Sequence, residues 1–202
     1  KNNNLVNHIV LTSVNRDDKN LESAKVFSDC ISKIKNLNLE IKIEVLIPDF
    51  LGDKKAYEII IKAEPDVLNH NIETVERVFR SVRAKGDYRL SLDLLLKTKE
   101  LNSYSVTKSG LMVGLGENWD EIINTLIDLR ASDCDLLTIG QYIKPTPKHT
   151  DVIKWYTPEE FIELRSIAMD LGFKGAVSGP LVRSSYKADE QYYQAKRLIP
   201  IS

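Results

Sequence analysis

Short apolar runs alternate along the chain with stretches whose apolar residues recur every three or four positions. Six runs rich in β-branched and other apolar side chains predict strands over residues 8–14, 39–47, 67–72, 109–115, 136–143 and 175–178. The intervening stretches predict helices over residues 21–34, 54–63, 75–82, 88–100, 120–129 and 157–171. Strand–helix alternation with short connections is typical of an α/β fold with a parallel sheet.

Polar residues follow nearly every predicted strand. In closed or partly closed parallel barrels, functional groups gather at the C-terminal ends of the strands. The sequence therefore predicts a site at one rim, drawn from Thr12, Ser13, Asn15, Arg16 and Asp17, then Asp49, then Asn69, Asn71 and Glu73, then Glu117, then Gln141 and Tyr142, and finally residues 183–186.

Composition indicates an ordinary globular domain. The chain has 202 residues, of which 43% are hydrophobic and 28% charged. Its 28 basic and 29 acidic residues give no indication of a nucleic-acid or anionic-membrane partner, and no apolar run reaches the roughly 18 residues of a spanning helix.

Cys30 and Cys134 are its two cysteines, which excludes a disulfide scaffold and fits a reducing compartment. They are too few to hold an iron–sulfur cluster, which usually takes three or four thiolates.

The segment from Gly110 to Glu117 combines an apolar strand with a glycine-rich turn. Backbone that lacks side chains at Gly114 and Gly116 could approach a flat ligand, such as an adenine ring, closely. The alternative is a tight turn into the next helix in which Glu117 acts as a capping group. Both interpretations stay open at the level of sequence.

Asn69, Asn71 and Glu73 are spaced two residues apart. If the strand runs through them, their side chains share one face and suit a zwitterionic amino acid or a ribose diol. His70 then falls on the opposite face, toward the helices, in a structural role.

Three further groups of charged or hydroxyl side chains leave alternatives open. Lys42 and Glu44 point into a barrel or lie on the solvated face of an edge strand. Ser184 and Ser185 belong to a surface loop or supply an oxygen ligand to iron. Lys108 suggests an aldolase-like Schiff base, but it is predicted to precede its strand, away from the strand end where such a lysine would act.

Taken in order, several segments resemble lipoyl synthase, a family of radical S-adenosylmethionine (SAM) enzymes. The resemblance covers essentially the whole chain. The segments are residues 12–18 (TSVNRDD), 43–50 (IEVLIPDF), 66–73 (DVLNHNIE), 107–117 (TKSGLMVGLGE), 137–142 (LTIGQY) and 178–186 (SGPLVRSSY).

The resemblance implies one partial (β/α)6 TIM-like barrel over residues 1–202 that lacks its first strand, with a C-terminal extension from about residue 175 carrying the RSSY segment. It also implies two 4Fe–4S clusters. One, held by a CxxxCxxC loop, cleaves SAM to a radical that abstracts hydrogen from C6 and C8 of an octanoyl chain on a carrier-protein lysine. The auxiliary cluster, held by three cysteines and an RSSY serine, donates two sulfur atoms.

Carried onto this chain, the resemblance assigns SAM binding and one iron ligand but no catalytic residue. The iron ligand is Ser185, with Ser184 the next choice. The SAM site takes Thr12, Ser13, Asn69, Asn71, Glu73, Gly114, Gly116, Glu117, Gln141 and Tyr142. The implied partners are octanoylated lipoyl-carrier domains (E2 subunits and the glycine cleavage H protein) and a reductant such as ferredoxin or flavodoxin. The implied compartment is the cytoplasm of a bacterium, or the mitochondrion or plastid of a eukaryote.

The chain departs from the family at the cluster-binding cysteines. The CxxxxCxxxxxC and CxxxCxxC segments should precede His8, and no such segment occurs in the sequence. We therefore expect a C-terminal part of a lipoyl synthase, inactive alone and with an exposed sheet edge. The alternative is a non-catalytic module that docks lipoyl-carrier proteins, and six cysteines encoded upstream in those spacings would eliminate it.

Overall fold

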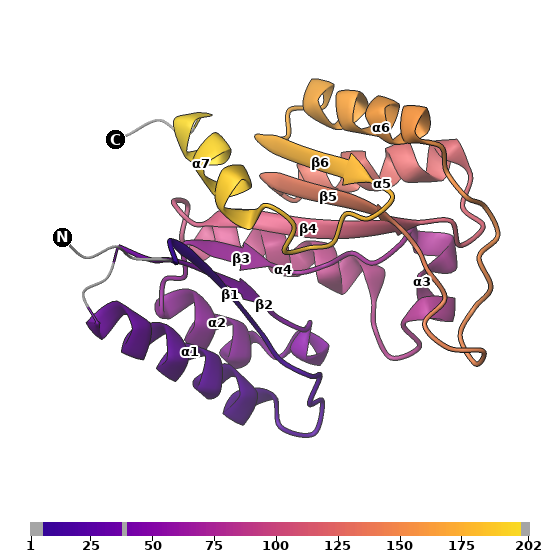
Figure 1. Cartoon of the computed structure of the whole chain (residues 1–202). Helices are drawn as coiled ribbons and strands as arrows, with labels where there is room; N and C mark the ends of the chain where they lie inside the picture. Colours follow the sequence, from indigo (N-terminus) through magenta and orange to yellow (C-terminus); the bar gives the residue numbers. More distant parts are fainter. Residues whose placement is uncertain (1–5, 38–39, 199–202) are drawn as a thin grey trace.

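In the part of the chain that the structure describes, six parallel strands form one sheet in the order in which they occur in the sequence (Figure 1). The computed structural model describes residues 6–37 and 40–198. The strands are β1 (His8–Thr12), β2 (Lys42–Leu46), β3 (Val67–Asn69), β4 (Val106–Val113), β5 (Leu136–Gln141) and β6 (Gly175–Gly179). The helices are α1 (Asn20–Asn36), the short 3-10 helix η1 (Phe50–Gly52), α2 (Lys54–Lys62), α3 (Glu76–Val82), α4 (Tyr88–Leu101), α5 (Trp119–Ala131), α6 (Pro158–Asp170) and α7 (Ala188–Leu198).

The predicted α/β class and the partial barrel are confirmed. Within the described residues, β1 and β6 each pair with a single neighbour, so the sheet is open. The segment expected to form a C-terminal extension begins with β6, which pairs with β5 over Gly175 to Gly179. No helix in the described part of the chain is long and apolar enough to cross a membrane.

Several strand boundaries differ from the prediction, and two of the differences, in β3 and β4, bear on the candidate site. β3 ends at Asn69, because the chain then turns and the isolated bridge from Glu73 to Leu111 replaces regular pairing. β4 begins at Val106, so Lys108 lies inside the strand and does not precede it. Neither η1 nor α7 was predicted.

Two apolar clusters hold helices α1 to α6 against the sheet. Residues such as Phe27, Ile43 and Ile60 pack between α1, α2 and the first strands, while Leu126, Ile139 and Phe161 belong to the larger cluster under α5 and α6. The predicted start of α6 is confirmed, since Thr157 and Glu160 form a capping box that satisfies backbone donors of the first turn.

Helix α7 lies apart from the other helices, at the N-terminal ends of the strands (Figure 1). Its Tyr192 and Ala195 pack against Val67, Val106 and Leu136, which are the first residues of β3, β4 and β5. The opposite, C-terminal ends of the strands are left to the loops that build the candidate site.

Candidate functional site

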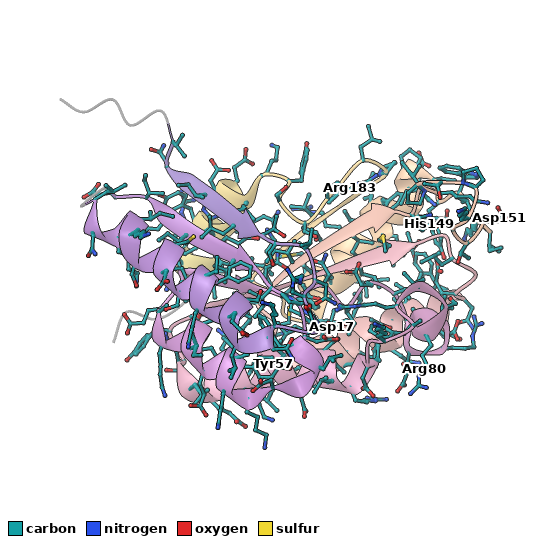
Figure 2. The ribbon with its side chains drawn as sticks, turned by 90° about the horizontal axis from the view of Figure 1, so that it is seen from below. Asp17, Tyr57, Arg80, His149, Asp151 and Arg183 are labelled. Carbon is teal, nitrogen blue, oxygen red and sulfur yellow. The ribbon has the colours of Figure 1, made fainter. Side chains whose placement is uncertain are left out.

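A cavity of about 390 Å³ lies at the C-terminal ends of β4 and β5. We call it cavity 1; its size falls within the roughly 300–1,000 Å³ of small-molecule sites. His149 and Arg183, labelled in Figure 2, are at its border. Its lining is largely apolar and comprises Asn71, Glu73, Val82, Gly110, Leu111, Met112, Thr138, Gly140, Gln141, Tyr142, Ile143, Pro145, His149, Val182, Arg183 and Ser184.

A second cavity of about 240 Å³, cavity 2, lies at the ends of β1, β2 and β3. Its lining is more polar and comprises Thr12, Ser13, Asn15, Leu46, Ile47, Pro48, His70, Asn71, Glu73 and Arg83. The structure therefore brings Thr12 and Ser13, predicted as part of a SAM site, to the same cavity as Asn71 and Glu73.

Asn71 and Glu73 line both cavities, so the segment after β3 separates them. Both residues lie beyond the end of β3 at Asn69. The prediction that they share one face of the strand with Asn69 is therefore wrong. Burial raises the pKa of the Glu73 carboxyl, while the charge of Arg83 and a hydrogen bond with Asn71 act against that rise. Glu73 also adopts a positive φ of 63°, which its backbone bonds to Gly110 and Met112 of β4 maintain.

His70 faces cavity 2, contrary to the prediction that it points toward the helices. The prediction assumed that side chains alternate between the two faces of a strand through residue 70, but β3 ends at Asn69. The His70 Nδ1 donates to the Ile47 carbonyl oxygen at 2.9 Å, and burial lowers the pKa of the ring to about 4. Its Nε2 is therefore an unprotonated acceptor, and this buried atom has no hydrogen-bond partner among the described residues.

The turn from Gly114 to Glu117 is closed by its own chain. The Glu117 carboxylate accepts hydrogen bonds from the backbone N–H groups of Gly114 and Leu115 at 2.6 and 2.8 Å. A Cβ at Gly114 would overlap the Gln141 amide and lie 2.6 Å from the Lys154 carbonyl oxygen, so the space above this glycine is filled. The geometry favours the tight-turn interpretation, except that Asn118, and not Glu117, caps the following helix α5. None of Gly114, Gly116 or Glu117 lines either cavity.

Gln141 and Tyr142 line cavity 1 and also anchor the loop that follows β5. The Gln141 side chain donates to the Lys154 carbonyl oxygen and accepts from the Tyr156 N–H, and the Tyr142 hydroxyl donates to the Thr150 carbonyl oxygen. These bonds hold the loop of residues 143–156 as one wall of the cavity.

Of the two candidate iron ligands, Ser184 lines cavity 1, whereas Ser185 is exposed and does not line it. The segment of residues 179–186 folds back over β4 and β5, where Gly110 and Gly140 leave room for it. A Cβ at Gly110 would come within 3.0 Å of the Ser184 Oγ, and one at Gly140 would overlap the Val182 carbonyl oxygen.

Asn69 lies below the cavities in a buried polar cluster and lines neither of them. Its Nδ2 donates to Glu44 Oε1 at 2.7 Å, and the Lys108 Nζ lies 3.1 Å from the same carboxylate. Burial acts to raise the pKa of Glu44, but His8, Lys108 and Asn69 together lower it; burial lowers the pKa of Lys108. Glu44 therefore points into the barrel, which was one of the two alternatives predicted for it. Lys108 balances the charge of its carboxylate, and Asn69 donates a hydrogen bond to it.

Comparison with known proteins assigns this architecture to a class. A sequence model of the Radical SAM superfamily matches residues 1–129, and the chain belongs to this superfamily. Two solved structures share the fold at 13% sequence identity. They are Streptococcus suis SuiB (TM-score 0.60; 81% of this chain and 36% of that chain) and a domain of pyruvate-formate lyase-activating enzyme from Bacteroides vulgatus (TM-score 0.62; 84% and 98%).

Within the superfamily, the chain is similar to proteins named lipoyl synthase, which confirms the resemblance. The one from Caldanaerobacter subterraneus subsp. tengcongensis is 50% identical over 182 residues, covering 90% of this chain and 64% of the relative. Those from Koribacter versatilis and Staphylococcus haemolyticus are 46% and 49% identical, covering 95% and 94% of this chain and 63% and 62% of the relatives. The chain thus spans less than two thirds of the length of the curated relatives it matches.

The donor set around cavity 2 fits an adenosylated amino acid. The orphaned Nε2 of His70 and the Glu73 carboxylate accept hydrogen bonds, Asn71 donates and accepts, and Arg83 is cationic. For a cluster, the described residues contribute little beyond a serine oxygen, because no group of three or more His, Cys, Asp or Glu side chains lies together in them.

Several cavity residues were not among those assigned to the site from sequence. Val82, Met112 and Val182 have the apolar character of core residues, and Arg83 follows a helix and not a strand. His149 lies in a loop. Of these residues, Met112 and Val182 carried a signal, since they belong to segments already singled out, and Arg183 had been predicted at the rim.

Proposed function

We propose that the full-length protein containing this chain is a lipoyl synthase, which inserts sulfur at C6 and C8 of an octanoyl-lysine on a lipoyl-carrier protein. The single observation that carries the proposal is the identity of about 50% to lipoyl synthases over 90% of the chain. Membership of the superfamily and the similarity to these relatives imply that SAM and 4Fe–4S clusters are the cofactors.

In this proposal, cavity 2 holds SAM. When bound, SAM and its cluster supply the oxidising power to abstract hydrogen from an unactivated carbon. Thr12 and Ser13 offer hydroxyls to the ligand, and His70 offers a neutral nitrogen that accepts a hydrogen bond. Asn71 and Glu73, at the boundary of the two cavities, bind the part of the ligand nearest the substrate.

Cavity 1 holds the octanoyl chain. An aliphatic chain needs an apolar lining that excludes water, and Val82, Leu111, Met112, Ile143 and Val182 provide one. Exclusion of water also protects a reactive carbon from side reactions. Ser184 borders this cavity, which supports the proposal that a serine oxygen of the RSSY segment binds the auxiliary cluster, the sulfur donor, beside the octanoyl chain.

The thiolate ligands of both clusters belong, in this proposal, to sequence that precedes His8 in the full-length protein. Cys134 is fully buried and burial raises the pKa of its thiol, which keeps it protonated; neither it nor Cys30 lines cavity 1 or cavity 2. The chain alone is therefore expected to be inactive. Carrier domains and a small electron-transfer protein are the proposed partners.

The test is lipoyl formation by the full-length protein on an octanoylated carrier domain, measured by mass spectrometry. We expect wild type to form the lipoyl group. The variant carrying both Ser184→Ala and Ser185→Ala should lose sulfur insertion by at least about a hundredfold while still cleaving SAM, since an oxygen ligand of the auxiliary cluster is removed and the SAM site is not.

Ser103→Ala, which changes an exposed serine in the loop between α4 and β4, is the matched control and should keep full activity. Normal lipoyl formation by the double variant would overturn the assignment of the serines. No sulfur insertion by the wild-type protein with reconstituted clusters would overturn the proposed function itself.

A further inference from the structure

Asn71 is the point of contact between the loop after β3 and the C-terminal segment of residues 179–186. The Ser184 Oγ donates a hydrogen bond to Asn71 Oδ1 at 2.8 Å, across 113 residues of sequence. Both residues line cavity 1, and Asn71 also lines cavity 2. This bond therefore joins the two sides of the candidate site.

The two groups of the Asn71–Ser184 hydrogen bond pack directly against the backbone of β4 at Gly110, which has no side chain. A Cβ at Gly110 would come within 2.6 Å of Asn71 Oδ1 and 3.0 Å of the Ser184 Oγ, so the glycine leaves the two polar groups just enough room to meet. Asn71 itself is held in place, because Glu73 two residues on donates its N–H to the Gly110 carbonyl oxygen and accepts from the Met112 N–H.

Past the end of β6 at Gly179, by contrast, the described backbone of the Ser184 segment is held by bonds within the segment and not by bonds to a neighbouring strand of the sheet. It is a tight loop whose described backbone hydrogen bonds are short-range, from Val182 N–H to the Gly179 carbonyl oxygen and from Tyr186 N–H to the Arg183 carbonyl oxygen. Ser184 is half-buried and its neighbours Arg183 and Ser185 are exposed. The rigid partner in the pair is therefore Asn71.

A serine hydroxyl has one proton and two lone pairs. Once the proton is committed to Asn71 Oδ1, the torsion angle of the hydroxyl is set and the lone pairs remain available on the cavity side. We propose that Asn71 is a positioning residue for Ser184: it fixes the rotamer of Ser184 and orients its oxygen as an acceptor or ligand toward cavity 1. The inference deepens the proposed function and rests on it for its catalytic meaning, but the geometry can be tested without any reaction.

The first measurement is hydrogen–deuterium exchange of the full-length protein as purified, followed at the amides of residues 182–186. Asn71→Leu keeps the approximate size of the side chain but removes the acceptor. Exchange should accelerate roughly fivefold, as expected for the loss of one hydrogen bond that restrains a local opening. Asn71→Asp retains an acceptor oxygen and should stay within about twofold of wild type.

Ser184→Ala provides the second variant and closes a double-mutant cycle. It should accelerate exchange by the same factor as Asn71→Leu, and combining the two should add nothing further. Asn15→Leu, the same substitution at an exposed asparagine of cavity 2, is the matched control and should leave these amides unchanged. The positioning role would be refuted if the exchange accelerations of the two single variants multiplied in the double variant, or if neither single variant accelerated exchange.

A second readout separates this inference from the proposed function. In the cluster-loaded enzyme, Asn71→Leu should lower sulfur insertion at least tenfold, and Asn71→Asp should restore most of it. If the exchange cycle shows coupling but wild type forms no lipoyl group, the proposed function fails and the positioning of Ser184 stands. If wild type is active and the exchange cycle shows no coupling, the proposed function stands and the positioning role of Asn71 fails.

Discussion

At the scale of single residues, the buried cluster of Glu44, Lys108 and Asn69 is the least expected feature. Both charged side chains are completely inaccessible to solvent. Taking two charges out of water is costly, and their attraction repays the cost only when further hydrogen bonds are present. Asn69 supplies such a bond, which explains why this asparagine serves the interior of the barrel and not the ligand.

Removing one partner of this pair should be strongly destabilising. Lys108→Met leaves the buried Glu44 carboxylate without the Lys108 cation, supported by His8 and Asn69 alone, and should cost about 3–5 kcal/mol in the free energy of unfolding measured by urea denaturation. Glu44→Leu combined with Lys108→Met should recover at least half of that loss, because no unpaired charge remains.

Lys42→Met is the control for this prediction, since Lys42 pairs with Asp66 in a partly exposed ion pair at 3.2 Å. It should cost less than about 1 kcal/mol. A double variant as unstable as Lys108→Met would show that the charge itself is not the cause of the destabilisation.

His70 predicts a specific dependence of stability on pH. Its pKa is lowered to about 4 in the folded chain by burial and by the charge of Arg83, against the Ile47 carbonyl bond and Asp49, while the unfolded value is 6.5. Between these values the unfolded state binds more protons, so stability is lost as pH falls from about 6.5 toward 4.

The expected loss attributable to His70 is on the order of 2 kcal/mol between about pH 7.5 and about pH 4.5. His70→Gln can still donate to the Ile47 carbonyl oxygen and should remove this part of the pH dependence in urea unfolding. The exposed His149→Gln should keep it. Identical pH profiles for wild type and His70→Gln would contradict the assignment.

At the scale of elements, α7 owes its position to one aromatic side chain. Tyr192 is buried against the first residues of three strands, and its hydroxyl donates to Asp66 Oδ1 at 3.2 Å. The helix otherwise presents small or polar side chains to the sheet, namely Ala188, Gln191 and Ala195. This sparse apolar pattern explains why helical periodicity did not predict α7.

Tyr192→Ala should therefore destabilise the chain by about 3 kcal/mol or more, because it removes a large buried side chain that the neighbouring backbone cannot replace. Tyr192→Phe should cost only about 1 kcal/mol, for the single hydrogen bond to Asp66. Both values come from thermal or urea unfolding.

The adjacent Tyr193 is the matched control, since it is 45% exposed. Tyr193→Ala should cost less than about 1 kcal/mol. If both tyrosine-to-alanine variants lost the same stability, α7 would be held by its exposed face or by its ends, and not by Tyr192.

At the scale of the whole molecule, the open sheet places two cavities of different character side by side. The more polar one lies over β1 to β3 and the largely apolar one over β4 and β5, and the segment of Asn71 and Glu73 lies between them. A polar cofactor and an aliphatic substrate would need such neighbouring sites, which supports the proposed sulfur insertion.

Local sequence was sufficient to predict the six strands, the helices α1 to α6, the parallel sheet and the rim at which the two cavities lie. Hydrophobic periodicity and the chemistry of helix starts act over a few residues, so they can be read without the fold. The placement of Thr12, Ser13, Asn71 and Glu73 at one rim followed from strand ends alone. The early end of β3 did not, because it depends on bonds from Glu73 to β4.

Tertiary structure alone decided which polar groups meet. Lys108 of β4 meets Glu44 of β2 across 64 residues, with β3 between the two strands, and Ser184 meets Asn71 across 113 residues, because the parallel sheet brings segments that are distant in sequence together. The glycines at positions 110 and 140 admit the C-terminal segment, and the tyrosine at position 192 docks the last helix. Such pairings depend on three-dimensional proximity and steric room, which no local pattern of residues encodes.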